Sequence, residues 1–491
     1  MIAIQAYLLQ QSHRYGAISA LAKEYKVCRQ FVYTLLSTLQ LMIPHLFSPV
    51  THAVSITKKE ILTAILSYRL EGGASIEAIS TLMERFEQGY SSVGYISQSL
   101  SSMGKLLPNT LKIEANEQQL IVFASDEIFS KSKPILITVE PKSSAILKIE
   151  LAEDRSGERW AEHFNTIEVN GFKAITMTSD GGLGLQSGKK KTLADATWQP
   201  DTYHAVAHRL GIWVSRFQES AYGAIAYEYS RQAVIASATT ELVIGKRVNA
   251  YEAALTETSK AIELYENFSF LYHCIIHSLK AFHSNGVLRE RKVSQGDIEA
   301  ALVLMESLNH KHVTKEVNTI KTLLPNLLNY FEQTKTSLKK CQSFDIQAEA
   351  LQTLCAAWQW DKALIKAKVF YRRAHAREQK TLSLQKAKLL LQEQYNKLKE
   401  KVFNELDNII QASSIVEGIN SILRPYLDRS KNQVTQEFLN LFMFYHNHRR
   451  YRAGKRKGKT PMEILLKHKQ DKDWIELLTD AIEKVEPAFF L

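Results

Sequence analysis

Residues 119–129 read QLIVFASDEIF, an apolar run with the length and residue types of a strand buried in a sheet. Two further strands are predicted at 134–140, PILITVE, and at 144–151, SAILKIEL, on either side of a turn signal. An amphipathic helix is predicted over 155–167 and a fourth strand, FKAITMTSD, over 172–180. Three strands, a helix and a strand predict a mixed sheet, in which a right-handed crossover brings in the last strand in parallel.

Two of these strands carry an aspartate where an unpaired charge is costly. Asp126 lies inside the first apolar run, and Asp180 ends the fourth strand before two glycines. A buried acid of this kind needs an ion pair, hydrogen bonds or a metal. The two carboxylates can meet in a sheet of this order, and they would suit Mg²⁺ or Mn²⁺. Either aspartate alone also fits a cap, turn or strand-end residue, and Glu127 should point to the opposite face of its strand.

A third acid lies on a helix predicted near the C-terminus. Ser413, Glu417, Asn420 and Arg424 are spaced i, i+4, i+7 and i+11, so they form one polar stripe, with apolar residues on the other side. The stripe could face an active site. Without the two aspartates, a solvated helix face would be the better interpretation.

The first hundred residues predict short helices and no strands. Residues 18–36 resemble a helix-turn-helix whose second helix exposes Arg29, Gln30 and Tyr33, where a recognition helix meets base edges. A second helical hairpin over 61–97 fits either another DNA reader or plain helix packing.

The remainder of the chain is helical in pattern, with a long charged helix predicted over 378–412. We therefore expect four parts of the chain. They are a helical DNA-binding region at 1–110, the first half of an α+β core at 115–205, a helical insertion at 206–400, and the second half of the core with a basic tail at 401–491.

Composition limits the class of protein. The 491 residues are 45% hydrophobic and 23% charged, which excludes a largely disordered chain, and no window suits a membrane span or a signal peptide. Four cysteines without metal or disulfide spacing fit a reducing compartment. The net charge of +11 suggests a polyanionic partner, and basic residues gather at 189–191, 371–377 and 449–459.

The element order, together with Asp126, Asp180 and Glu417, resembles the ribonuclease-H-like core of DDE transposases and retroviral-type integrases. The tail FYHNHRRYRAGKRKGKTPMEIL (444–465) is similar to the segment that closes many insertion-sequence transposases, although Arg450 stands where proline is common. Related transposases also often have an Asp-x-x-His motif after the second acid, matched here by Asp201 and His204.

The resemblance implies a DDE transposase that catalyses metal-dependent DNA cleavage and strand transfer. Asp126, Asp180 and Glu417 would be the catalytic residues and would bind Mg²⁺ or Mn²⁺, as two ions that clamp the scissile phosphate. Supporting roles fall to Asp201, His204, Asn420 and Arg424, with a local hydrogen bond between Asp201 and His204. The expected DNA contacts are Arg29, Gln30, Tyr33, Lys189, Lys190, Lys191, Arg372, Arg373, Arg449, Arg450, Arg452, Lys455, Arg456 and Lys457.

Such a protein would act as a homo-oligomer on double-stranded DNA, namely the terminal repeats of a mobile element and its target, in the bacterial cytoplasm at the nucleoid. Two other classes stay open at this point. One is a non-catalytic DNA-binding protein, such as a domesticated transposase used as a regulator. The other is a helical scaffold protein, which would give no reason for acids at two strand positions. In the insertion, Trp358 and Trp360 beside the basic stretch 371–377 could stack on an unpaired base, although two tryptophans in a helical bundle more often belong to its core.

Overall fold

The computed structural model describes the chain except for residues 48–55, 114–117, 432, 455 and 491. It divides into two compact units, Met1–Ile61 and Leu62–Leu491. Among the described residues, no helix is both long and apolar enough to cross a membrane. Because the boundary between the two units lies at Ile61, the predicted helical region 1–110 is not one body, and its second half belongs to the larger unit.

The first unit contains the predicted helix-turn-helix. Its helices are α1 (Ile2–Gln11), α2 (Ala17–Glu24) and α3 (Arg29–Phe47). A small core holds them together, formed by Ala6, Leu21, Ala22, Val32 and Leu36. Arg29, Gln30 and Tyr33 are exposed at the start of α3, as a recognition helix requires. DNA contact by these three residues stays a prediction.

The second helical hairpin packs against the C-terminal part of the chain. It consists of α4 (Lys58–Leu66), the π-helix η1 (Ser67–Glu71), α5 (Ile76–Arg85) and α6 (Val93–Lys105). Gly104 of α6 allows close approach to α18 (Gln436–His448), because a Cβ there would lie 2.2 Å from the Glu437 carbonyl oxygen. Asn440 of α18 donates to the Gly104 carbonyl at 2.9 Å. Of the two interpretations of this hairpin, helix packing is the one that these contacts support.

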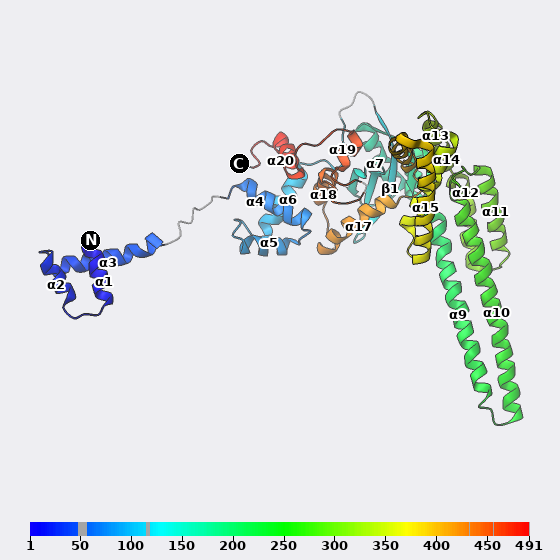
Figure 1. Ribbon diagram of the computed structural model, residues 1–491, viewed down its shortest axis with the longest axis horizontal. Helices are drawn as coiled ribbons and strands as arrows, with labels where there is room; N and C mark the ends of the chain where they lie inside the picture. Colours follow the sequence, from blue (N-terminus) through cyan, green and yellow to red (C-terminus); the bar gives the residue numbers. More distant parts are fainter. Residues whose placement is uncertain (48–55, 114–117, 432, 455, 491) are drawn as a thin grey trace. The chain divides into compact units, whose positions relative to one another are not determined.

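The predicted strand order is present, with one strand added. The sheet contains β1 (Gln119–Ser130), β2 (Lys133–Glu140), β3 (Ala145–Leu151), β4 (Phe172–Ser179) and β5 (Thr197–Pro200), in the order β3-β2-β1-β4-β5. The pairs β1–β2 and β2–β3 are antiparallel, and β1–β4 and β4–β5 are parallel. Helix α7 (Gly157–Val169) makes the crossover from β3 to β4 (Figure 1). The architecture is thus a mixed α+β fold around a five-stranded sheet.

Helices cover both faces of the sheet. On one face, Phe123 and Met177 pack with Trp160 and Phe164 of α7 and with Leu185 of α8 (Leu183–Thr192). The other face is covered by α18 and by α17 (Ser414–Arg429), which contact β3 and β1 respectively. Side chains that alternate along β1 therefore point either to α7 or to α17.

Residues of the tail motif have structural partners. The side-chain amide of Asn447 accepts from the Ile146 N–H at 2.8 Å and donates to its carbonyl at 2.9 Å, as a neighbouring strand would. Thr460 and Glu463 form a capping box on α19 (Pro461–Leu466), with Pro461 in the first turn. Helix α20 (Trp474–Val485) then ends the described fold. These bonds explain the Asn and Thr-Pro-x-Glu positions through folding alone.

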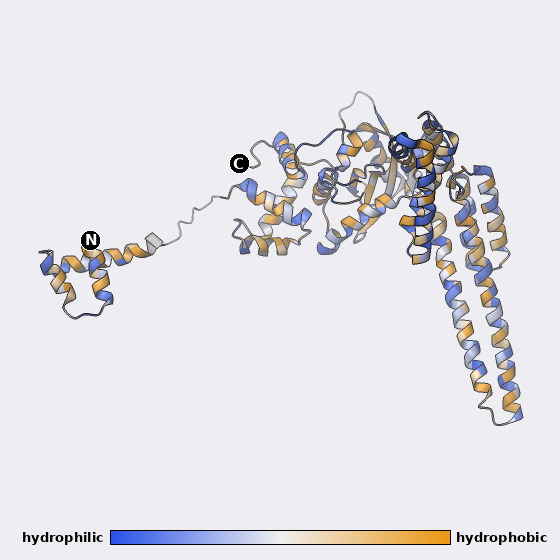
Figure 2. Cartoon of the chain, viewed as in Figure 1, coloured by the Kyte–Doolittle hydropathy of each residue, from blue (hydrophilic) through white to orange (hydrophobic). Residues whose placement is uncertain are grey.

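Residues between the two parts of the core form the predicted helical insertion (Figure 1). Its helices are η2 (Tyr203–His208, a π-helix), α9 (Arg209–Ile235), α10 (Glu241–Ser278), α11 (Arg291–Glu306), α12 (Lys311–Leu327), α13 (Tyr330–Gln342), α14 (Ala348–Lys366), α15 (Phe370–Leu391), η3 (Gln392–Gln394) and α16 (Tyr395–Asp407). Hydrophobic and hydrophilic residues alternate along α9 and α10 (Figure 2). The insertion is seated on the sheet by Gln199 of β5, which donates to the Leu327 carbonyl at 3.0 Å and accepts from the Tyr330 N–H at 2.8 Å.

One prediction for the insertion is wrong, and one of the two alternatives for Trp358 is supported. The helix predicted over 378–412 is broken, because Gln392 has a positive φ of 47° and separates α15 from α16. Trp358 is a core residue: it is buried and donates its indole N–H to Asp407 at 2.8 Å, so its ring is not free to stack on a base.

Two buried histidines predict loss of stability in mild acid. Burial lowers the pKa of His163 to about 4, even though its hydrogen bond to Glu150 favours the charged form, and burial lowers the pKa of His446 to about 3. Because the unfolded chain takes up these protons near pH 6.5 and the folded chain does not, stability falls as the pH drops from about 6.5 to 4. His163 alone accounts for about 3 kcal/mol of this loss. Urea unfolding of wild type and His163→Asn at pH 7.5 and 4.5 measures this loss of stability.

The control is the exposed His468→Asn variant. If the free energy of unfolding changes equally with pH in His163→Asn and in wild type, the prediction is contradicted.

Candidate active site

The first two predicted acids are brought together by the register of β1 and β4. Ala124 pairs with Thr178, and Asp126 and Asp180 each lie two residues further along these parallel strands. Their side chains therefore point to the same face of the sheet, at the end where β4 stops. Consistent with this proximity, the negative charge of Asp180 is one of the causes that raise the pKa of Asp126.

All three predicted acids line one hollow of about 560 Å³. Its wall is formed by the ends of β1 and β4, by the start of α17, and by His204. The lining residues are Asp126, Glu127, Ile128, Asp180, His204, Ser413, Ser414, Glu417, Gly418, Asn420, Ser421 and Arg424. The polar stripe predicted on α17 thus lines the same hollow as the two aspartates.

Asp126 has the least favourable electrostatic position in the hollow. Its carboxylate accepts from Asn420 Nδ2 at 2.8 Å and from the Glu127 N–H at 2.9 Å. Burial first, and then the charges of Asp180, Glu127 and Glu417, raise its pKa to about 7. A cation among these carboxylates would reverse that repulsion.

Glu127 points to the opposite face of β1 from Asp126, as the alternation predicts, but it also lines the hollow. It points to the α7 side of β1, as alternation requires, but the paired part of β4 ends at Ser179. Its Oε1 therefore reaches past the end of the sheet and lies 3.9 Å from the position of a Cβ on Gly182. Arg155 holds it there in an ion pair of 2.6 Å. Because Glu127 is paired with Arg155, it lines the site without being a candidate ligand. The candidate ligands are Asp126, Asp180 and Glu417.

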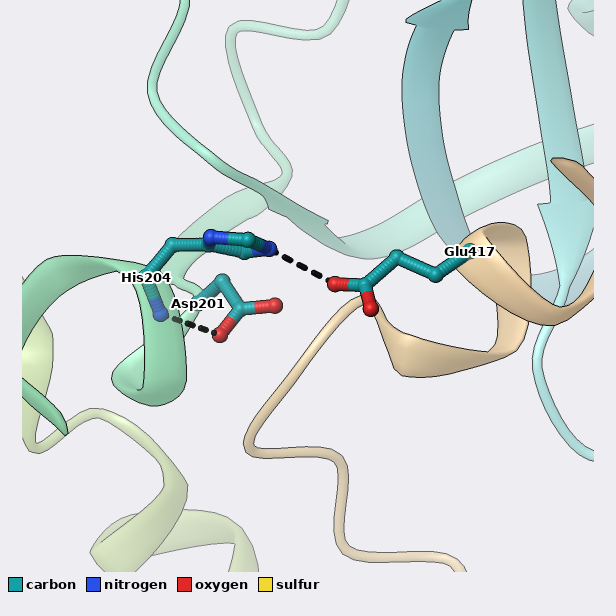
Figure 3. Close-up of side chains that lie close together, drawn as sticks. All are labelled: Asp201, His204 and Glu417. Carbon is teal, nitrogen blue, oxygen red and sulfur yellow. Dashed lines mark hydrogen bonds and ion pairs between the residues drawn. The ribbon is translucent and has the colours of Figure 1, made fainter. Parts of the chain in front are cut away.

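Glu417 is held by His204, from the other side of the split core (Figure 3). His204 Nε2 lies 2.6 Å from Glu417 Oε1. Burial alone would lower the pKa of His204, but the hydrogen bond to Glu417 and the charges of Asp201, Glu417 and Asp180 raise it above its usual value. The imidazole thus favours its charged form and neutralises part of the acidic cluster.

Asp201 is an anchor for the backbone around it. Its Oδ1 accepts from the N–H groups of Tyr203 at 2.7 Å and His204 at 3.1 Å, and its Oδ2 accepts from the Ser413 N–H at 2.6 Å and hydroxyl at 2.7 Å. The predicted Asp201–His204 bond therefore exists, but it involves the backbone of His204 and not its ring (Figure 3). Asp201, His204 and Glu417 each offer a ligand atom within 4.8 Å of the others. Since all four acceptor positions of Asp201 are used, it is poorly suited to bind a metal.

The same contacts join the two halves of the core across the insertion. Thr202 donates its N–H to the Gln411 carbonyl at 2.9 Å and its hydroxyl to the same oxygen at 3.0 Å. With the Asp201–Ser413 bonds, they fix the start of α17 against the end of β5. Glu417 lies one turn beyond this junction, so the junction determines where the third acid stands.

The donor set fits a divalent cation bound by oxygen. Asp126, Asp180 and Glu417 supply carboxylates, and the buried Oδ1 of Asn420 has no hydrogen-bond partner among the described residues. The unpaired Asn420 Oδ1 and the raised pKa of the neighbouring Asp126 both indicate that a cation would be favourable here. Mg²⁺ or Mn²⁺ would supply it.

The predicted DNA contacts lie outside this hollow. Lys189, Lys190 and Lys191 are in the last turn of α8, and Lys191 pairs with Glu158. Arg372 and Arg373 are exposed on α15. Lys455 lies outside the described residues.

In the tail, the predicted basic residues differ in their surroundings. Arg450 bonds Glu463 at 2.9 Å, and Arg456 donates to the carbonyls of Pro141 at 3.0 Å and Lys142 at 2.9 Å. Arg449 lies over the ring of Tyr445. Arg452 and Lys457 are exposed, which makes these two the better candidates for phosphate contact.

No family model matches this chain, and no curated protein matches it. Among solved structures, a chain of the Drosophila P element transposase strand transfer complex is similar, with 10% sequence identity and a TM-score of 0.24. The match covers 93% of this chain and 100% of that chain. A TM-score of this size does not establish a shared fold.

Proposed function

We propose that the chain is a DDE-type transposase, a metal-dependent polynucleotidyl transferase that cuts and joins DNA strands. The observation that carries the proposal is one hollow lined by Asp126, Asp180 and Glu417, which come from two strands and a helix far apart in the sequence. The order of strands and helices around it agrees with the ribonuclease-H-like core of that family. A scaffold or a non-catalytic regulator would not need these acids together.

Six of the residues that line the hollow have a proposed task in this reaction. Asp126, Asp180 and Glu417 would hold Mg²⁺ or Mn²⁺, which when bound would polarise the scissile phosphate and lower the pKa of an attacking water or 3′-hydroxyl. Asn420 orients Asp126 through its amide, and His204 orients Glu417 through its ring. Arg424, exposed at the rim, can bind a phosphate oxygen of the substrate.

If the chain is a transposase, the ends of its mobile element would lie in the sequences that flank this gene. The test is cleavage of DNA that carries these flanking sequences. Purified protein should nick these ends in Mg²⁺ or Mn²⁺ and not in EDTA. Products with a free 3′-hydroxyl should then join to a second DNA. Cleavage that persists in EDTA would contradict the proposal, and so would a wild-type protein that binds these ends but never cuts them in either metal.

The basic tail gives a separate prediction about DNA affinity. Arg452→Ala should reduce the slope of log affinity against log salt concentration by about one, because one phosphate contact is lost. Arg456→Ala should instead lower the melting temperature, because its guanidinium bonds two backbone carbonyls of the protein. Fluorescence anisotropy across a salt series and thermal unfolding of both variants separate the two roles. The reverse pattern would show that Arg456 is the DNA contact.

A further inference from the structure

A second hollow opens directly beside the first. It measures about 420 Å³ and is lined by Asp180, His204, His208, Arg209, Ile212, Trp213, Arg216 and Glu316. Asp180 and His204 line both hollows, so the two form one continuous cleft. Arg424 lines the first hollow and Arg216 the second.

The second hollow belongs to the first turns of the insertion. Arg209, Trp213 and Arg216 are spaced i, i+4 and i+7, so they share one face of α9. Arg209 is paired with Glu316 at 3.0 Å, which neutralises its charge. No acid within ion-pair distance of Arg216 is found in the described part of the chain, and its guanidinium lies over the Trp213 ring, 4.6 Å from the centroid.

Trp213 acts here as a support. One face of its ring is stacked on His312, with 4.9 Å between centroids and an angle of 16° between the planes. Arg216 lies over the ring as well. The indole therefore has little free surface for a base, and its effect is to hold the Arg216 charge at the wall of the cleft.

We propose that the second hollow binds the backbone of the DNA strand next to the phosphate that is cut, with Arg216 as the phosphate contact. The inference rests on the proposed function, since that places the cut phosphate at Asp126 and Asp180. An arginine without an acidic partner, held by a ring in the same cleft, is suited to a phosphate oxygen. The insertion would then form part of the substrate site through α9.

The test compares two arginines of the same helix. Arg231, further along α9, also lies over an aromatic ring, that of Tyr227 at 4.5 Å, but it does not line either hollow. DNA fragments carrying the gene's flanking sequences are bound in Ca²⁺, and affinity is measured by fluorescence anisotropy across a salt series. Arg216→Ala should bind about tenfold more weakly and lose about one from the salt slope. Arg231→Ala should match wild type, and Arg216→Lys should keep the slope.

Two further measurements separate this proposal from the proposed function. In Mg²⁺, Arg216→Ala should raise the KM for cleavage with little change in kcat, because the contact is made before and during the reaction. An Arg216→Ala protein with the circular dichroism, affinity and salt slope of wild type would overturn the DNA subsite. That result would leave the catalytic assignment standing, whereas cleavage retained by Asp126→Asn would refute the catalytic assignment without affecting the binding result.

Discussion

Asp126→Asn is expected to reduce DNA cleavage by about 10³-fold, because it removes the carboxylate at the centre of the acidic cluster while keeping its size. Asn can still accept from Asn420, so the local fold should persist. Glu417→Gln should have a similar effect for the same reason. In both variants, calorimetric titration with Mn²⁺ should show weaker binding, and DNA affinity measured in EDTA should stay close to wild type.

The matched control is Glu153→Gln, which removes an exposed carboxylate of the same unit whose only described pairing is a surface ion pair with Lys133. Surface pairs of this kind contribute little to stability, so this variant should cut DNA and bind Mn²⁺ like wild type. If Asp126→Asn cuts DNA as well as Glu153→Gln does, Asp126 is not a catalytic residue.

Asp201→Ala is expected to destabilise the protein by about 3 kcal/mol and to reduce cleavage by about 10²-fold. It leaves the N–H groups of Tyr203, His204 and Ser413 without the acceptor that they now share. It also releases the start of α17, and a catalytic group displaced by about 1 Å can cost that much in rate. Urea unfolding and cleavage assays at a temperature where the variant is folded measure the two effects.

Asp201→Asn is the informative partner of this variant. Its Oδ1 can still accept two N–H groups, but its amide nitrogen cannot accept from Ser413. It should therefore recover part of the stability and less of the activity, since Ser413 precedes Glu417 by one turn. The exposed Asp154→Ala variant should be close to wild type in activity. Equal recovery of stability and activity by Asp201→Asn would indicate a general folding role and no specific effect on Glu417.

Local patterns were enough to predict the first half of the core. Alternation and apolar runs give four of the five strands, because each strand is long enough to show its own period. The stripe on α17 was visible for the same reason. That Asp126 and Asp180 lie on the same face of neighbouring strands follows from the strand order, since only a parallel β1–β4 pair places them side by side.

Features that depend on distant partners were not visible. β5 has four residues, too few to show a period, and it is defined by its pairing with β4. The anchoring role of Asp201 depends on Ser413, 212 residues away. Likewise, Arg450 and Arg452 look alike in sequence, but Glu463 accepts from the first and the second stays exposed. The i, i+4, i+7 spacing of Arg209, Trp213 and Arg216 could have drawn attention to the second hollow.

The long separation of the two core halves in the chain also sets the earliest time during synthesis at which the proposed activity can begin. The ring of His204 and the carboxylate of Glu417 are 213 residues apart in the chain. At about 5–20 residues per second, a ribosome needs roughly 10–40 s to make that stretch. All five strands leave the ribosome long before Glu417 is made, so a nascent chain holds only the two aspartates of the cluster, and the proposed DNA cleavage must wait until α17 has been translated.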